Sequence, residues 1–264
     1  MKWLVFSRNR TFQLDCFLRS AKQNAQINMK NVSVLYRYDF DFSESLEVLK
    51  LEYPDCTFIN ETNFREQTIE WVEKSTDTIS FATDDALFTR EVKSDFATEI
   101  LRHNSEIFTV SLRLGMNLEW CYPTNQYQHI PNGNVSNSQL FVWDASQAQC
   151  DWGYPLSVDG HIYRKHEILK ILKRTSFTNP NTLEANIQAM KPFIQHTSCC
   201  FLKSSYFNSP LNMVQSVFNN RSGQVSIEEL EKVYRSGKRI DSSLIKNFHN
   251  LSAHQEVNLL EFCK

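Results

Sequence analysis

Two adjacent carboxylates, Asp84 and Asp85, directly follow the apolar run 78–83, which has the composition of a buried strand. Acidic side chains at the point where such a strand ends are costly unless a positive group lies beside them. A hard divalent cation that also binds phosphate oxygens is a natural candidate for that group. The alternative interpretation is a helix N-cap or a solvated loop. The pair is therefore a candidate cation and phosphate site.

The elements that would position this pair alternate between strands and helices. Apolar runs and capping residues predict strands over 2–7, 32–36, 56–59 and 78–83, with helices over 11–25, over 43–52 and from Asn63. Such alternation is typical of a parallel sheet with right-handed crossovers, so we predict an α/β fold. Ligands of these sheets bind beyond the carboxyl ends of the strands, where the Ser7-Arg8 turn and the Asp84-Asp85 pair both fall.

The second half of the chain is less regular. The pattern predicts strands over 108–114, 139–143 and 201–205, a loop-rich stretch over 117–137, and helices over 166–173 and after a cap at Asn181. From Asn212 the pattern is largely helical, with a capping box at 226–229 and Gly237 at a helix C-cap. We therefore predict one compact domain over 1–210 and a C-terminal helical extension over 211–264 packed on the same domain.

The composition limits the function classes. The chain has 264 residues, 19 Phe and a net charge of −2, which favours a packed globular protein and predicts no nucleic-acid partner. No apolar stretch is long enough for a transmembrane segment, and the short apolar run at the N-terminus is read as a strand. The seven cysteines form no C-x-x-C pair, which favours reduced thiols and a cytoplasmic location.

The common glycine-rich phosphate loops are absent from the sequence. With six glycines, the chain contains neither G-x-G-x-x-G nor a Walker loop, and it also lacks the G-x-S-x-G and H-E-x-x-H motifs. If the protein binds a nucleotide, a metal ion and side chains must hold the phosphates.

Four ordered segments carry a resemblance to a known family; they are Phe6–Arg10 with Gln13 and Leu14, Phe81–Phe88, Ser111–Asn117 and Asp151–His161. In this order the chain, over about residues 1–210, resembles a GT-A-type nucleotide-sugar glycosyltransferase of the small bacterial and large-virus kind. The resemblance implies a Rossmann-like, mostly parallel sheet flanked by helices. It also implies a nucleotide-sugar half over 1–115 and an acceptor half over 116–210.

The activity that this resemblance implies is transfer of a sugar from a nucleoside-diphosphate sugar, with UDP-sugar favoured, to a glycan hydroxyl. Such enzymes use Mn²⁺ or Mg²⁺ to neutralise the charge on the leaving diphosphate. An inverting mechanism is expected. A retaining mechanism stays open, because the spacing of the motifs does not determine the stereochemistry.

The resemblance assigns Ser7 and Arg8 to donor binding, whereas the plain alternative for the turn that they share with Arg10 is a solvated loop. Asp85 is expected to hold the cation and Asp84 to contact ribose directly or through water. The family motif usually carries an acid one position earlier, where this chain has Thr83.

Two residues outside these motifs are further candidates for the donor site. Arg113, on an apolar strand, needs a partner if it is buried; it is expected either near the donor sugar or in a salt bridge with a structural carboxylate. His254 is expected as a second metal ligand, because several members of the class bring a C-terminal His to the cation and Mn²⁺ accepts imidazole. A surface histidine is the alternative.

Asp159, predicted at a strand end before Gly160, is the candidate general base, as implied by inverting members of the class. Asp151 and Asp144 are the competitors, and a β-turn Asp-Gly pair is the alternative. The acceptor-binding candidates are Asp151, Trp152 and Tyr154. Aromatic faces suit a sugar ring, although both aromatic residues are equally typical of a core.

Two other function classes compete with this one. A sugar-1-phosphate nucleotidyltransferase shares the nucleotide-binding architecture, but it normally has a glycine-rich loop after the first strand, and Ser7–Arg10 contains no glycine. The missing first acid makes a catalytically degenerate nucleotide- or glycan-binding module the other alternative. The C-terminal helices are expected to shape the acceptor site or to contact a partner enzyme or a membrane surface.

Overall fold

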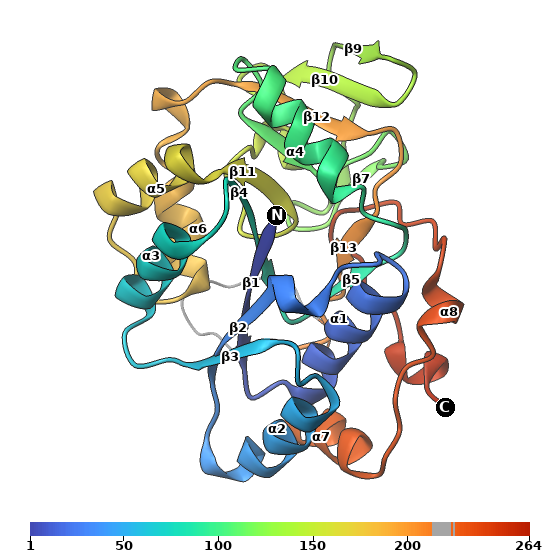
Figure 1. Cartoon of the computed structure of the whole chain (residues 1–264). Coiled ribbons are helices and arrows are strands. Elements are labelled where there is room, and N and C mark those ends of the chain that lie inside the picture. Colours follow the sequence, from blue (N-terminus) through green and yellow to red (C-terminus); the bar gives the residue numbers. More distant parts are fainter. Residues whose placement is uncertain (213–222, 224) are drawn as a thin grey trace.

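The computed structural model describes residues 1–212, 223 and 225–264. Within these residues the central sheet has nine strands in the order β3-β2-β1-β4-β11-β6-β12-β10-β9 (Figure 1). Its strands are β1 (Lys2–Arg8), β2 (Val32–Arg37), β3 (Thr57–Asn60), β4 (Thr78–Thr83), β6 (Thr109–Ser111), β9 (Gly133–Ser136), β10 (Leu140–Asp144), β11 (His161–Arg164) and β12 (Thr197–Phe201). Two small sheets pair β5 (Ala86–Phe88) with β13 (Tyr206–Asn208), and β7 (Trp120–Cys121) with β8 (Gln126–Tyr127).

The helices connect these strands and cover both faces of the sheet. They are α1 (Thr11–Gln23), α2 (Phe40–Glu52), α3 (Phe64–Lys74), α4 (Ser94–His103), α5 (Lys165–Arg174), α6 (Pro180–Gln188), α7 (Ile227–Arg235) and α8 (Ser242–Ile245). Short 3-10 helices lie at Met29–Asn31, Cys150–Gly153, Lys191–Phe193 and Leu259–Phe262. The predicted α/β class is therefore confirmed.

Alternate residues of β1 show how the two faces are buried. Trp3 and Val5 belong to one core cluster, together with residues of α1, α4, α7 and α8, whereas Leu4 and Phe6 belong to another, together with residues of α3, α5 and α6. Successive side chains of a strand point to opposite faces, so a strand covered on both sides must be apolar throughout. Figure 1 shows α3, α5 and α6 on one side of the sheet and α1 with α8 on the other.

The first four strands of the sheet run parallel, as predicted. Phe6 of β1 lies beside Leu35 of β2 and Thr83 of β4 in the parallel registers. The carboxyl ends of β1, β2 and β4 therefore meet at one edge, where the turn after Arg8 and the Asp84-Asp85 pair lie together.

The second half of the sheet is mixed. β11 is antiparallel to both β4 and β6, and β10 is antiparallel to β9 and β12. Because β11 runs against β4, its first residue lies near the last residue of β4. Asp159 thus precedes a strand instead of ending one, and the antiparallel pairing still brings it to the end of β4.

Several predicted boundaries shift for local reasons. The strand expected over 108–114 is only Thr109–Ser111, and the one expected over 201–205 is wrong, because only Phe201 lies in β12 and 202–205 connect β12 to β13. The helix cap expected at Asn181 is Asn179, whose side chain accepts from the Thr182 N–H. The helix begins two residues earlier because Pro180 suits the first helical position, where no N–H is needed.

The C-terminal segment is less helical than predicted. In the described part after residue 225, α7, α8 and one 3-10 helix alternate with irregular backbone, and the start of the predicted helical segment, 213–222 and 224, lies outside the described residues. The cap at Ser226 is confirmed, since its side chain accepts from the Glu229 N–H at 3.0 Å. Gly237 is confirmed at the end of α7, where its φ of +85° favours glycine.

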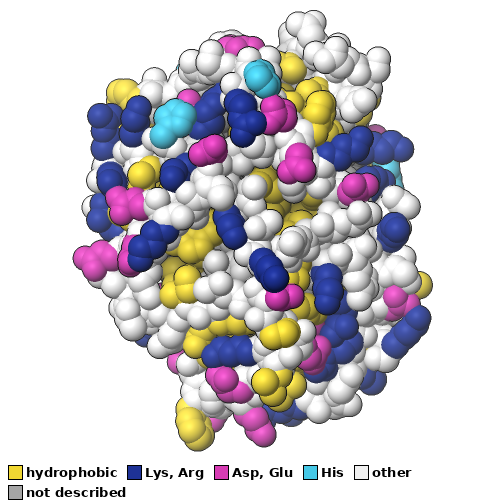
Figure 2. Space-filling view, in the orientation of Figure 1, with side chains coloured by type: hydrophobic (Ala, Val, Ile, Leu, Met, Phe, Trp, Pro, Cys, Tyr) yellow, Lys and Arg dark blue, Asp and Glu magenta, His cyan; other side chains and the backbone are white. Residues whose placement is uncertain are grey.

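An ion-pair cluster links this segment to the first helices. Arg239, after α7, lies 2.8 Å from a carboxylate oxygen of Glu52 and 3.8 Å from one of the buried Asp15. α7 itself packs against α1 and α2. On the face in Figure 2, positive and negative side chains are interspersed. Among the described residues, no helix combines the length and apolar character needed to cross a membrane.

Candidate active site

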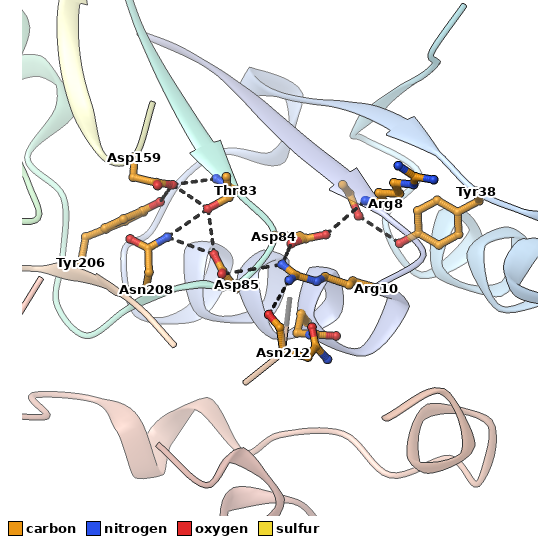
Figure 3. Close-up of polar contacts among 12 residues, drawn as sticks. Arg8, Arg10, Tyr38, Thr83, Asp84, Asp85, Asp159, Tyr206, Asn208 and Asn212 are labelled. Carbon is orange, nitrogen blue, oxygen red and sulfur yellow. Dashed lines mark hydrogen bonds and ion pairs between the residues drawn. The ribbon is translucent and has the colours of Figure 1, made fainter. Parts of the chain in front are cut away.

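A buried guanidinium lies beside the Asp84-Asp85 pair (Figure 3). Nη1 of Arg10 donates to Oδ1 of Asp84 at 3.0 Å and lies 3.6 Å from Oδ2 of Asp85. Its Nη2 donates to the Asn212 carbonyl at 2.7 Å. The alternative of a solvated turn is therefore wrong for Arg10, which is buried. The positive charge that the acidic pair requires is supplied, at least in part, by the chain itself.

Asp84 is an anchor of the turn after β1. Its Oδ1 accepts from Arg10 and its Oδ2 accepts from the Arg8 N–H at 3.3 Å. Burial outweighs the nearby guanidinium and raises the pKa of Asp84 to about 6. With both oxygens engaged and the residue buried, Asp84 has little surface left for the predicted ribose contact.

The remaining donor-site candidates line the same edge. The Ser7 hydroxyl lies 3.0 Å from the phenolic oxygen of Tyr38, and both are held at the ends of parallel strands. The Arg8 side chain is exposed, so its guanidinium is accessible to an anionic ligand. Ser7, Arg8 and the acidic pair are therefore brought together as the sequence predicted.

The hydroxyl of Thr83 joins two carboxylates that are far apart in the sequence. Its Oγ1 lies 2.7 Å from Oδ1 of Asp85 and 2.6 Å from Oδ1 of Asp159 (Figure 3). Asn208 donates through Nδ2 to Oγ1 of Thr83 and to Oδ1 of Asp85, both at 3.0 Å. One hydroxyl carries one proton, so it serves one carboxylate at a time. The end of β4 thus couples the proposed cation ligand to the proposed base.

Asp159 is held through one of its oxygens. The Thr83 N–H at 3.0 Å and the Tyr206 hydroxyl at 3.2 Å both donate to Oδ1. Its Oδ2 has no hydrogen-bond partner within the described part of the chain and keeps contact with solvent. Gly160 has a φ of +64°, and a Cβ there would lie 2.9 Å from the Tyr206 ring, so glycine is required beside the candidate base.

Arg113 makes the structural salt bridge that was one of its two expected roles. Its Nη2 lies 3.6 Å from Oδ1 of Asp151 and 3.1 Å from Nδ1 of His254, and its Nη1 donates to the Ser157 hydroxyl at 2.8 Å. Ser157 in turn donates to Glu184 at 2.8 Å and accepts from the Asp159 N–H at 3.1 Å. Arg113 therefore fixes the loop that carries the candidate base.

His254 is brought to the site by backbone pairing with β13. It forms a parallel β-bridge with Asn208, whose side chain contacts Asp85. Its ring stacks on Tyr122, with 6.4 Å between centroids. Burial and Arg113 lower the pKa of His254 to about 4, so the ring is neutral at pH 7.

The acceptor-site candidates separate into core and accessible residues. Trp152 is fully buried, with its ring 5.0 Å from that of Trp143, so the prediction that it stacks on a sugar is wrong. Asp151 is also buried, between Arg113 and the Gln128 amide at 2.9 Å. Tyr154 is half-buried, and the acidic groups Glu184 and Asp159 add to burial in raising its pKa. Asp144, the competitor for the base, is exposed and accepts from the Ser146 N–H.

The residues present fit a metal ion that binds together with a diphosphate better than they fit an ion that binds to the protein alone. Among the described residues, no group of three or more His, Cys, Asp or Glu side chains could hold a metal ion. Asp85 offers Oδ2, which makes no hydrogen bond at normal distance, on a side chain that is 17% exposed. Diphosphate oxygens would have to complete the coordination of Mg²⁺ or Mn²⁺.

Sequence reasoning missed three residues that complete the site: Tyr206, Asn208 and Glu184. Tyr206 and Asn208 are on β13, whose pairing with β5 sets them beside Asp85 and Asp159. They belong to no motif, and the alternation of the short strand gives no signal for a ligand site. Arg10 was visible in the turn, but its burial was not.

An α/β fold with acidic groups beyond the carboxyl ends of parallel strands is an architecture in which nucleotide ligands bind. No family model matches the chain. The bifunctional glycosyltransferase pgtA of Dictyostelium discoideum is 27% identical over 280 aligned residues, which cover 92% of this chain and 36% of that relative. The chain thus spans about a third of the length of this curated relative. The similarity confirms the predicted resemblance to glycosyltransferases and supports the predicted enzyme class, a glycosyltransferase.

Solved structures resemble the chain more distantly. TarS of S. aureus has a TM-score of 0.49 at 14% identity, over 79% of this chain and 36% of that one. A cytidylyltransferase of Leptospira borgpetersenii has a TM-score of 0.45 at 12% identity, over 93% of this chain and 96% of that one. Likenesses this distant do not distinguish sugar transfer from nucleotide transfer.

Proposed function

We propose that the protein is a metal-dependent, inverting glycosyltransferase that moves a sugar from a nucleoside-diphosphate sugar, with UDP-sugar favoured, to a glycan hydroxyl. The observation that carries the proposal is the Thr83 hydroxyl, which lies within hydrogen-bond distance of both Asp85 and Asp159. A phosphate site and a base separated by one hydroxyl suit a single displacement at a sugar carbon that lies between them. The similarity to a glycosyltransferase supports the same reaction class.

The donor would lie across the carboxyl ends of β1 and β4. Ser7 and the exposed Arg8 would contact the nucleotide, and Asp85 would hold the ion through Oδ2, whose ion-pair partner Arg10 lies 3.6 Å away. A Mn²⁺ or Mg²⁺ ion bound there with the diphosphate would neutralise the charge that grows on the leaving group. Arg10 adds a second positive charge 3.6 Å from Asp85 and keeps the acidic pair from repelling the donor.

Asp159 would act as the general base. The acceptor oxygen attacks the anomeric carbon as the bond from that carbon to the diphosphate oxygen breaks, and the diphosphate leaves with the electron pair. The acceptor proton passes to Oδ2 of Asp159, which is reachable by solvent while Oδ1 is held by Thr83 and Tyr206. Attack opposite the leaving group inverts the configuration. Tyr154, which is half-buried, would contact the acceptor, whereas Asp151 is buried and would act only through Arg113.

A thermal-shift and turnover experiment tests this function. The wild type is screened against UDP, GDP and CMP and their sugar conjugates, each with Mn²⁺, Mg²⁺ or EDTA. Metal-dependent stabilisation by one nucleoside diphosphate, with hydrolysis of its sugar conjugate that Asp85→Asn and Asp159→Asn abolish, supports the proposal. If no nucleotide stabilises the protein, the proposal is wrong.

A catalytically degenerate binding module is the second candidate, and Arg10 favours it because a guanidinium already pairs with the acidic residues. Such a module would bind the nucleotide without turnover, and the same screen separates the two. A sugar-1-phosphate nucleotidyltransferase would instead release pyrophosphate from a nucleoside triphosphate.

The chain corresponds to about a third of a relative named as bifunctional. We propose that a second enzyme unit is a partner of this chain, contacted through the C-terminal segment around α7 and α8. A contact with a membrane surface is the alternative. Crosslinking the chain with its partner and mapping the linked lysines distinguishes these cases.

A further inference from the structure

The hydrogen bond between Arg113 and His254 fixes which nitrogen of the imidazole carries the proton. Nη2 of Arg113 lies 3.1 Å from Nδ1 of His254. A guanidinium has donors and no acceptor, so Nδ1 must accept. A neutral imidazole that accepts at Nδ1 carries its proton on Nε2. The tautomer of His254 is thus assigned by a partner that can only donate.

The arginine that assigns the tautomer is itself rigidly held. Arg113 is buried, donates to the Ser157 hydroxyl at 2.8 Å and faces Asp151 at 3.6 Å. Because these contacts point its guanidinium at His254, moving the ring proton to Nδ1 would set an N–H against an N–H. The same contact requires the neutral ring, because an imidazolium would carry a proton on Nδ1 against the guanidinium.

The other nitrogen of the ring is open to a ligand. Nε2 of His254 has no hydrogen-bond partner in the described part of the chain and keeps contact with solvent. The residue pairs through its backbone with Asn208, which donates to Oδ1 of Asp85 at 3.0 Å. The free N–H therefore lies at the edge of the proposed diphosphate site.

This arrangement does not fit the expected role of His254 as a metal ligand. A nitrogen that carries a proton has no lone pair for a cation, and the lone pair of Nδ1 is taken by Arg113. We propose that His254 is a neutral hydrogen-bond donor, which binds a diphosphate oxygen of the nucleotide donor through Nε2–H, and that Arg113 is the positioning residue that sets this tautomer. The inference rests on the proposed function, because the ligand is the donor's diphosphate.

Two substitutions at His254 distinguish a hydrogen-bond donor from a metal ligand at this position. The side-chain amide of His254→Gln can present an N–H at the position of Nε2, whereas His254→Asn keeps an acceptor for Arg113 and loses the distal group. UDP and GDP affinities are measured by calorimetry in EDTA and again with Mn²⁺. We expect His254→Asn to weaken nucleotide binding about tenfold in both buffers, as for a lost hydrogen bond to a charged group, and His254→Gln to retain it within about threefold.

The affinity of Mn²⁺ for the UDP-bound protein is the matched readout, and we expect it to be unchanged in both variants. A rise in the Mn²⁺ Kd of about tenfold in His254→Asn, with no loss of UDP affinity in EDTA, would instead make His254 a ligand and overturn the inference. If the wild type binds UDP or GDP and His254→Asn binds equally well, the inference fails and the proposed function stands. If the wild type binds neither, both fail.

The tautomer is measured independently of any nucleotide. The ¹⁵N shifts of the His254 ring in the free protein are expected to show an unprotonated Nδ1 and a protonated Nε2. In Arg113→Met we expect this preference to be lost. Arg90→Met serves as the control, because Arg90 donates to the Thr89 hydroxyl and to backbone carbonyls of Ser204, Asn247 and Phe248. A protonated Nδ1 in the wild type overturns the inference.

Discussion

Thr83 Oγ1 lies 2.6 Å from Oδ1 of Asp159, although the two residues are 76 positions apart in the chain. The contact exists because β11 is antiparallel to β4, so the residue before β11 reaches the end of β4. The same hydroxyl reaches Asp85 at 2.7 Å. The proposed base and the proposed cation ligand therefore share one hydrogen-bond partner.

Replacing this hydroxyl is expected to affect turnover more than folding. Thr83→Val keeps the shape of the side chain and removes a hydrogen bond worth about 1 kcal/mol of stability. We expect kcat to fall at least about tenfold, because Asp159 and Asp85 both lose a partner. Thr78→Val is the control, since its hydroxyl bonds that of Thr98 at the opposite end of β4. Equal kcat values in the two variants would contradict the shared role.

Neutralising the candidate base is expected to abolish turnover while nucleotide binding persists. Asp159→Asn retains the Oδ1 contacts and removes the proton acceptor, so kcat should fall about 10²- to 10⁴-fold with an unchanged Kd for the nucleoside diphosphate. Asp144→Asn changes an exposed carboxylate on β10 and should leave kcat unaltered. Steady-state kinetics and calorimetry on both variants provide the measurement. A base role is ruled out if Asp159→Asn turns over normally.

Manganese binding is expected to depend on the nucleotide. Without three protein ligands among the described residues, the protein alone should bind Mn²⁺ only weakly, and the nucleoside diphosphate should tighten that binding by supplying oxygens. Electron paramagnetic resonance of free Mn²⁺, with and without UDP, measures this. In Asp85→Asn, UDP should no longer tighten Mn²⁺ binding, whereas in Asp55→Asn, at an exposed position, it should do so as in the wild type. Tight Mn²⁺ binding without nucleotide would show that a complete ion site exists.

Trp152 is expected to act on stability and not on acceptor affinity. Trp152→Ala removes a fully buried indole between Phe141 and Trp143 and should cost about 3–5 kcal/mol in the free energy of unfolding. Tyr154→Ala, at a half-buried position, should cost less and raise the acceptor KM. Urea denaturation and acceptor kinetics compare the two. If Trp152→Ala unfolds, Trp152→Phe with an unchanged acceptor KM gives the same answer.

The buried His161 should make the protein sensitive to acid. Burial lowers its pKa from 6.5 to about 3, so the unfolded chain binds a proton between these values that the folded chain does not. Its contribution to stability is therefore complete above pH 6.5 and is lost as the pH falls toward 3, with a slope of up to about 1.4 kcal/mol per pH unit. In His161→Phe the slope of unfolding free energy against pH should be smaller by about one proton. An identical slope would show that His161 titrates normally.

The amino-acid sequence by itself determined the parallel half of the sheet and the edge where the candidate donor site lies. The buried strands β1, β2 and β4 consist mainly of apolar residues, and Ser7, Arg8 and the Asp84-Asp85 pair lie at or just after their ends. Local periodicity and capping suffice here because strand and helix alternate at short range. The position of Asp159 was visible only as an Asp-Gly pair, whose role depends on which strand follows it.

The tertiary structure alone decided the partners of these residues. Arg10 could be a solvated turn residue or a buried counter-ion, and only the packing of the Asn212 carbonyl against it makes it the latter. Tyr206 and Asn208 reach the site because β13 pairs with β5, although the two strands are more than a hundred residues apart in the sequence. Trp152 was an equally plausible sugar platform and core residue until its neighbours were known. Burial and long-range pairing depend on the whole chain, so no local pattern encodes them.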